Sequence, residues 1–110
     1  MPYDEDLANR LRELLADEDG ITEKKMFGGL AFLLHGHMSV SASGRGGVLA
    51  RIDPAETEAM LKKAHVSRME MGGRTMDGWL RVAPDGIKTK RQLEPWVKRS
   101  LGYVKTLPPK

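Results

Sequence analysis

The chain contains no cysteine, so it offers no disulfide framework, no thiolate nucleophile and no cysteine-based zinc site. Aromatic residues make up only 5%, and the 7 methionines are expected to fill core space that rings would otherwise occupy. No apolar run approaches the roughly 20 residues that cross a bilayer. The acidic start, MPYDEDLANR, lacks the basic and apolar regions of a secretory signal. A cytoplasmic protein without a membrane partner is therefore expected.

The length of 110 residues is typical of one domain, and residues 1–110 are expected to form a single one. Apolar residues make up 40% and charged residues 30%, which argues against disorder. The net charge is +3, but the charges are unevenly distributed along the chain. Carboxylates dominate residues 4–20, and lysine and arginine dominate residues 88–110. This asymmetry fits a nucleic-acid surface at the basic end, two end helices lying side by side, contact across a homodimer, or solvated helix faces.

The first half of the chain predicts one helix followed by a sheet. Between residues 4 and 19, leucines recur at helical spacing, at Leu7, Leu11, Leu14 and Leu15. Residues 24–51 are expected to contain three antiparallel strands, with tight turns at residues 35–37 and 43–47.

Two features of this sheet segment bear on its surface. Gly28 and Gly29 are interpreted as a kink, bulge or close backbone approach within the first strand. Serines alternate with apolar residues in the second strand, which predicts a polar sheet face left free for a partner, formed by Ser39, Ser41 and Ser43. One face of the sheet is therefore expected to meet solvent.

A second helix is expected to begin at Asp53 and Pro54 and to continue to about His65. Asp is a favoured N-cap, Pro suits the first helical position, and Glu56 completes a capping box. Two further strands are predicted at residues 66–71 and 79–82.

The chain is expected to close with a third helix. Thr89 and Gln92 have the spacing of another capping box, and apolar residues continue at helical spacing to Val104. Because Pro95 removes a backbone hydrogen bond, the regular part of this helix is expected to start near Glu94 or Pro95.

Residues capable of catalysis or metal binding do not form a recognisable motif. His35 and His37 would project to one face of an extended strand, where two imidazoles can share a metal, but no further ligand lies at a motif spacing and a turn explains both residues without a metal. This alternative remains open. The chain has no nucleophile elbow, phosphate-binding loop or paired acid and base at motif spacing. We therefore expect no enzymatic activity and no cofactor.

Cations of the basic closing segment are the candidate contacts for a nucleic acid or another partner: Lys90, Arg91, Lys98, Arg99 and Lys105. Phosphate contacts through them predict an affinity that falls steeply with salt. The acidic opening segment and the small net charge argue against this interpretation. Direct nucleic-acid binding is therefore the alternative to protein interaction.

Three blocks carry a family resemblance: KKMFGGLAFLLHGHM, GRTMDGWLRV and EPWVKRSLGYV. The matching positions are Met26, Phe27, Gly28, Gly29, Met38, Gly73, Arg74, Met76, Gly78, Trp96 and Tyr103. In this order and spacing, the chain resembles the N-terminal domain of the TfoX/Sxy family of bacterial competence regulators, from the opening helix to Lys105. Among these positions, Gly28 and Gly29 are interpreted as backbone geometry and not as a binding loop.

The resemblance implies a two-layer α+β fold with an antiparallel sheet, in the order helix, three strands, helix, two strands, helix. This agrees with the order predicted from the patterns above. It also implies a non-enzymatic regulatory role, because larger members promote competence-gene transcription together with a cyclic-AMP receptor protein. Their C-terminal domain is not matched, so its activity is not expected here. The expected function is a stand-alone regulatory domain that binds a protein partner, with a homodimer as an alternative.

Overall fold

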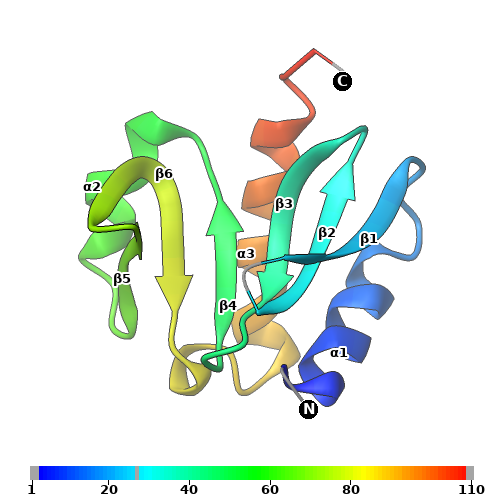
Figure 1. The fold of residues 1–110 in the computed structure, drawn as a ribbon, viewed down its shortest axis with the longest axis horizontal. Coiled ribbons are helices and arrows are strands. Elements are labelled where there is room, and N and C mark those ends of the chain that lie inside the picture. Colours follow the sequence, from blue (N-terminus) through cyan, green and yellow to red (C-terminus); the bar gives the residue numbers. More distant parts are fainter. Residues whose placement is uncertain (1–2, 27, 109–110) are drawn as a thin grey trace.

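The computed structural model describes residues 3–26 and 28–108, which form three α-helices, two short 3-10 helices and one antiparallel sheet (Figure 1). In chain order the elements are α1 (Glu5–Leu15), β1 (Ile21–Met26), β2 (Gly29–Leu34), β3 (His37–Ala42), β4 (Val48–Arg51), η1 (Pro54–Glu56), α2 (Thr57–Leu61), β5 (Val66–Met71), β6 (Arg74–Val82), η2 (Pro84–Gly86) and α3 (Lys90–Val104). The α+β class is therefore confirmed.

The sheet has six strands in the order β1-β2-β3-β4-β6-β5, and all neighbours are antiparallel. The predicted order with three strands before the second helix is wrong, because four strands precede α2. Met26 pairs with Gly29, so the chain reverses where a kink within one strand was expected. Gly28 has φ +75°, and a Cβ on Gly29 would lie 2.1 Å from the Ala42 carbonyl oxygen. Glycine at these positions permits both the reversal and the close approach.

Two-residue turns join two of the hairpins. His35 and Gly36 connect β2 to β3 with φ values of +50° and +88°, and Gly72 and Gly73 connect β5 to β6 with +59° and +80°. Two consecutive positive φ values are typical of the hairpin turn whose twist matches that of the flanking strands. The predicted turn at the first of these sites is confirmed.

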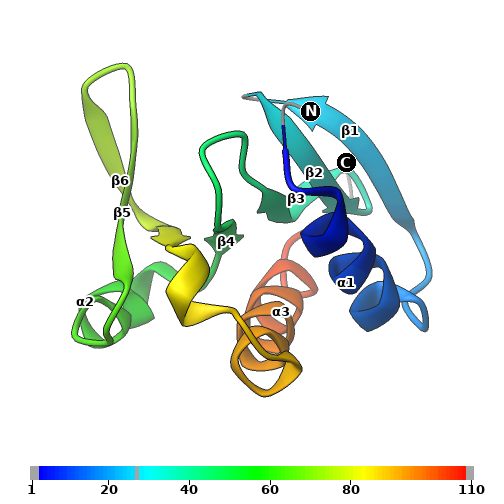
Figure 2. The ribbon, with the colours of Figure 1, turned by 90° about the horizontal axis from the view of Figure 1, so that it is seen from below.

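The helices α1 and α3 lie side by side on one face of the sheet, and α2 covers the β5–β6 end of the same face (Figures 1 and 2). Leu11, Phe32, Leu80 and Leu93 are among the fully buried side chains of this helix-facing core. Lys105, directly after α3, donates to Glu18, which lies just beyond the end of α1, at 2.9 Å. The interpretation that the acidic and basic ends lie together is thus confirmed.

The third helix begins at Lys90, so the expectation that it becomes regular only near Pro95 is wrong. Its capping box is present: the Gln92 amide donates to Thr89 Oγ1, and the Thr89 amide donates to Gln92 Oε1, both at 3.2 Å. Pro95 is exposed and lies inside this helix, where its missing N–H removes the hydrogen bond to the Arg91 carbonyl.

The second helical segment is shorter than expected and ends at Leu61 rather than about His65. Asp53 caps this segment as predicted, because its Oδ1 accepts a hydrogen bond from the Ala55 amide at 2.9 Å. The predicted capping box is wrong, since the Glu56 amide donates to the Asp53 carbonyl at 2.9 Å and the Glu56 carboxylate pairs with Arg99. The segment opens as the 3-10 helix η1 before α2 begins. His65 has φ +68°, which is incompatible with a continuing right-handed helix.

The serine-bearing face predicted to meet solvent is buried, and that expectation is wrong. The exposed fractions are 0% for Ser39, 1% for Ser41 and 5% for Ser43. The β2–β3 register shifts at Ser39, since Phe32 pairs with Val40 but Leu33 pairs with Met38. Ser39 Oγ and Ser100 Oγ of α3 are 2.6 Å apart, so Ser39 faces the helices together with its neighbour Val40. The simple alternation of side chains is interrupted at this bulge.

Candidate interaction groove

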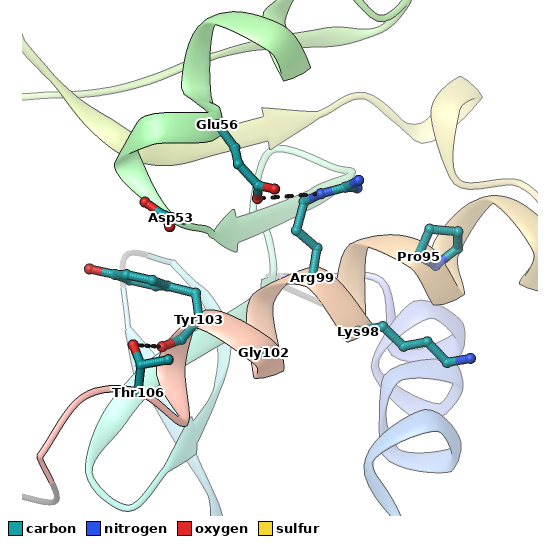
Figure 3. Close-up of a pocket in the computed structure, with 8 residues that line it drawn as sticks. All are labelled: Asp53, Glu56, Pro95, Lys98, Arg99, Gly102, Tyr103 and Thr106. Carbon is teal, nitrogen blue, oxygen red and sulfur yellow. Dashed lines mark hydrogen bonds and ion pairs between the residues drawn. The ribbon is translucent and has the colours of Figure 1, made fainter.

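A groove runs along α3, between this helix and the segment that contains η1 and α2. It consists of two adjacent cavities of about 560 Å³ and 430 Å³, and both are lined by Pro95 and Arg99. We call the two together the α2–α3 groove; Figure 3 shows the larger part. Its full lining is Asp53, Glu56, Lys63, Ala64, His65, Val66, Val82, Gly86, Arg91, Gln92, Pro95, Trp96, Lys98, Arg99, Gly102, Tyr103 and Thr106.

The groove exists because the two helices pack on different strands. α3 packs against β3 and β4, whereas α2 packs against β5 and β6. Val66 and Val82 come from β5 and β6, and Trp96, which is 6% exposed, comes from α3. The smaller cavity therefore combines an apolar floor with polar walls.

An ion pair crosses the larger cavity. Arg99 extends from α3 toward η1, where its Nε lies 3.6 Å from Glu56 Oε2 (Figure 3). The Arg99 guanidinium also lies 5.9 Å from the centre of the Trp96 ring. The Tyr103 side chain projects from α3 on the Asp53 side of the cavity, while Lys98 points the other way (Figure 3). The same cavity thus presents charges of both signs and an aromatic ring.

The predicted cations of the closing segment have different neighbours in the structure. Arg91, Lys98 and Arg99 line the α2–α3 groove. Lys90 instead lies beside α1 in a small cavity, and Lys105 forms its ion pair with Glu18. The five side chains do not form one continuous basic face.

The family model described as the TfoX N-terminal domain matches residues 13–103. The chain belongs to the TfoX N-terminal domain family. The match begins within α1 and ends one residue before the end of α3, so it includes the whole sheet and most of the groove lining. No curated protein and no solved structure matches the chain significantly.

Most positions that carried the resemblance to the TfoX N-terminal domain have a structural place. Met38 and Trp96 are buried, and Met26 packs at the edge of a second apolar cluster. Gly73 and Gly78 have φ values of +80° and +87°. Arg74 is exposed and Met76 is 52% exposed on the β5–β6 hairpin, and Phe27 lies outside the described residues. Trp96 and Tyr103 both line the groove.

Gly78 is part of a network that fixes the groove wall to the sheet. Its amide donates to Thr57 Oγ1 at 2.7 Å, and its carbonyl accepts from the Ile52 amide at 2.7 Å. A Cβ on Gly78 would lie 2.7 Å from the Ile52 carbonyl oxygen. These contacts and its positive φ give the family-like Gly78 a role in backbone geometry.

The acidic members of the groove were not identified from the sequence. Asp53 and Glu56 were interpreted only as helix-capping residues, and nothing in their spacing relates them to Arg99 more than 40 positions later.

The two histidines weighed as metal ligands have other surroundings. His37 Nε2 donates to the Pro108 carbonyl at 2.6 Å, and His35 lies in the β2–β3 turn. Within the part of the chain that the structure describes, no three histidine, aspartate or glutamate residues are grouped as a metal site requires.

Among residues 3–26 and 28–108, no helix has the length and apolar character needed to cross a membrane.

Proposed function

We propose that this domain is a non-catalytic regulatory module that binds a segment of a partner protein in the α2–α3 groove. Membership of the TfoX N-terminal domain family supports a regulatory role connected with competence and transcription. The cysteine-free composition supports action in the cytoplasm. The groove carries the proposal, because it joins apolar, aromatic and charged side chains along the length of one helix.

The charge pattern of the groove favours a polypeptide over a nucleic-acid backbone. Asp53 and Glu56 lie on the same wall, and a phosphate that approached Arg99 would also meet both carboxylates. A polypeptide can offer charges of both signs and an apolar side chain to the floor beside Trp96. At the Arg91 end the groove has cations without carboxylates in its lining, which favours an acidic residue of the partner there.

Gly102 provides a direct test of this groove. It lies on α3, and a Cβ added to it meets no atom within 4 Å. Gly102→Trp is therefore expected to fill the larger cavity without disturbing the core, and Gly102→Ala is the matched control that leaves the cavity open. Both variants and the unchanged domain would be expressed in the native cell, captured after nuclease treatment, and analysed for bound polypeptides.

A partner polypeptide that is retained by the unchanged domain and by Gly102→Ala, but lost with Gly102→Trp, supports the proposal. Transcripts that depend on the domain should fall with the same variant. The proposal fails if the bound material is a nucleic acid that nuclease removes, if a second copy of this chain is the occupant, or if Gly102→Trp retains the partner fully. Turnover of a substrate that one polar substitution abolishes would contradict the non-catalytic assignment.

A further inference from the structure

A small cavity on the side of the sheet opposite the helices gathers two arginines above an apolar floor. Its volume is about 190 Å³, with Leu49 and Met69 beneath and Ser43, Arg45, Glu70 and Arg81 around it. Leu49 and Arg81 are register partners in β4 and β6, whereas Val48 and Val82 face the helix-side core. Figure 2 shows the helices on one side of the sheet and the β5–β6 hairpin rising on the other.

The charge of Arg81 has no counterion among the described residues. Its Nη1 donates to two neutral acceptors, Ser43 Oγ at 2.9 Å and the Gly46 carbonyl at 3.5 Å. In residues 3–26 and 28–108 neither Arg81 nor Arg45 forms an ion pair. Burial, and secondarily the charge of Arg45, lowers the pKa of Arg81. Two cations therefore line one cavity without an ion-pair partner among the described residues, although the Glu70 carboxylate also lines it.

Ser43 adds a third donor to this site. Its Oγ accepts one hydrogen bond from the Arg45 amide at 3.1 Å and another from Arg81 Nη1. A hydroxyl has two acceptor lone pairs and one proton, so both acceptor positions are occupied and the proton remains to be donated. The Ser43 hydroxyl and the two guanidinium groups together form a set of donors suited to an anion.

We propose that this cavity binds the phosphate group of a small molecule. A phosphate presents acceptor oxygens in several directions and accepts paired hydrogen bonds from a guanidinium, whereas a carboxylate has two oxygens in one plane. The cavity is smaller than the roughly 300 Å³ at which pockets for drug-sized ligands begin, which favours a compact ligand. Glu70 lies at the rim and opposes the anion, so its carboxylate limits the affinity.

NMR titration of the full chain tests this site, with the arginine side-chain N–H signals as the readout. The probes are inorganic phosphate, glycerol 3-phosphate and acetate, each at constant ionic strength. Arg45 is exposed and its guanidinium makes no hydrogen bond within the described residues, so Arg45→Gln should fold. Arg81→Lys keeps the charge but removes the paired donors, and Arg91→Gln, on the helix side, is the matched control.

We expect saturable shifts of the Arg81 signals with inorganic phosphate or with glycerol 3-phosphate. The probe that binds with the lower dissociation constant shows whether the site prefers free phosphate or a phosphate ester. Arg45→Gln should weaken binding about fivefold, as expected for one exposed charge-assisted contact. Arg81→Lys should also weaken it, Glu70→Gln should tighten it, and Arg91→Gln should leave it unchanged. Absence of shifts, equal binding of acetate, or equal weakening by Arg91→Gln overturns the proposal.

Discussion

The buried contact between Ser39 and Ser100 makes a prediction that depends on the direction of its hydrogen bonds. Ser100 Oγ donates to the Ser39 carbonyl at 2.9 Å, so its single proton is used there. The 2.6 Å contact between the two hydroxyls must then be a donation from Ser39 Oγ to Ser100 Oγ. Ser100 serves as donor and acceptor at once, whereas Ser39 Oγ only donates.

This asymmetry predicts unequal losses of stability. Ser39→Ala removes one hydrogen bond and leaves the Ser100 donation intact, so we expect a loss of about 1 kcal/mol. Ser100→Ala removes both bonds and leaves the buried Ser39 hydroxyl without an acceptor, so we expect a loss of about 2 kcal/mol. The double variant no longer contains that stranded hydroxyl and should lose no more than Ser100→Ala alone. The two substitutions are therefore coupled by about 1 kcal/mol.

Urea unfolding of the four proteins, followed by circular dichroism, measures these differences directly. Ser67→Ala, an exposed serine on β5, is the control and should lie within about 0.5 kcal/mol of the unchanged protein. Equal losses for the two single variants, or strictly additive losses in the double variant, would refute the assigned directions.

Two further predictions concern the backbone and the acid limit of stability. Gly29→Ala should prevent folding or sharply lower the unfolding midpoint, because the new Cβ would meet the Ala42 carbonyl oxygen. Gly102→Ala should instead raise the free energy of unfolding by roughly 0.5–1 kcal/mol, because alanine has the higher helix propensity. Arg12, which donates to both carboxylate oxygens of Glu23 at 2.7 and 2.8 Å, lowers the pKa of Glu23 below its usual 4.5. The Arg12–Glu23 contact therefore stabilises the folded state fully above pH 4.5, and this contribution is lost as the pH falls through the lowered pKa of Glu23. The difference in unfolding free energy between the unchanged protein and Glu23→Gln should shrink in acid. Unfolding measured over an acid pH series would show this change.

The parts of the fold that could be predicted are those determined locally. The leucine spacing of α1, the Thr89 cap and the β2–β3 turn each depend on neighbouring residues, and all three agree with the structure. The errors arose where distant packing decides the outcome. Alternation cannot reveal the bulge that turns Ser39 toward Ser100, and a glycine pair is equally compatible with a kink and with the reversal between β1 and β2.

The candidate site was predictable only in its chemistry. The closing segment identified Arg91, Lys98 and Arg99 as cations, but their different neighbours depend on how α3 packs against α1 and the sheet. Helical spacing places Arg91, Lys98 and Lys105 on one face, since they are seven residues apart. It does not show that Lys105 pairs with Glu18 while Arg91 borders a groove.

The strand order explains why that groove exists. β6 rather than β5 pairs with β4, so β5 occupies the sheet edge and α2 packs over the outer β5–β6 hairpin. α3 packs over β3 and β4, so the path from Asp53 through η1 to α2 passes beside α3 without covering it. The polar residues of the groove walls are not members of either apolar cluster. The larger cluster lies between the helices and the sheet, and the smaller one lies on the opposite face of the sheet. Substitutions of exposed wall residues should therefore change binding without unfolding the domain, which allows the groove and the fold to be tested separately.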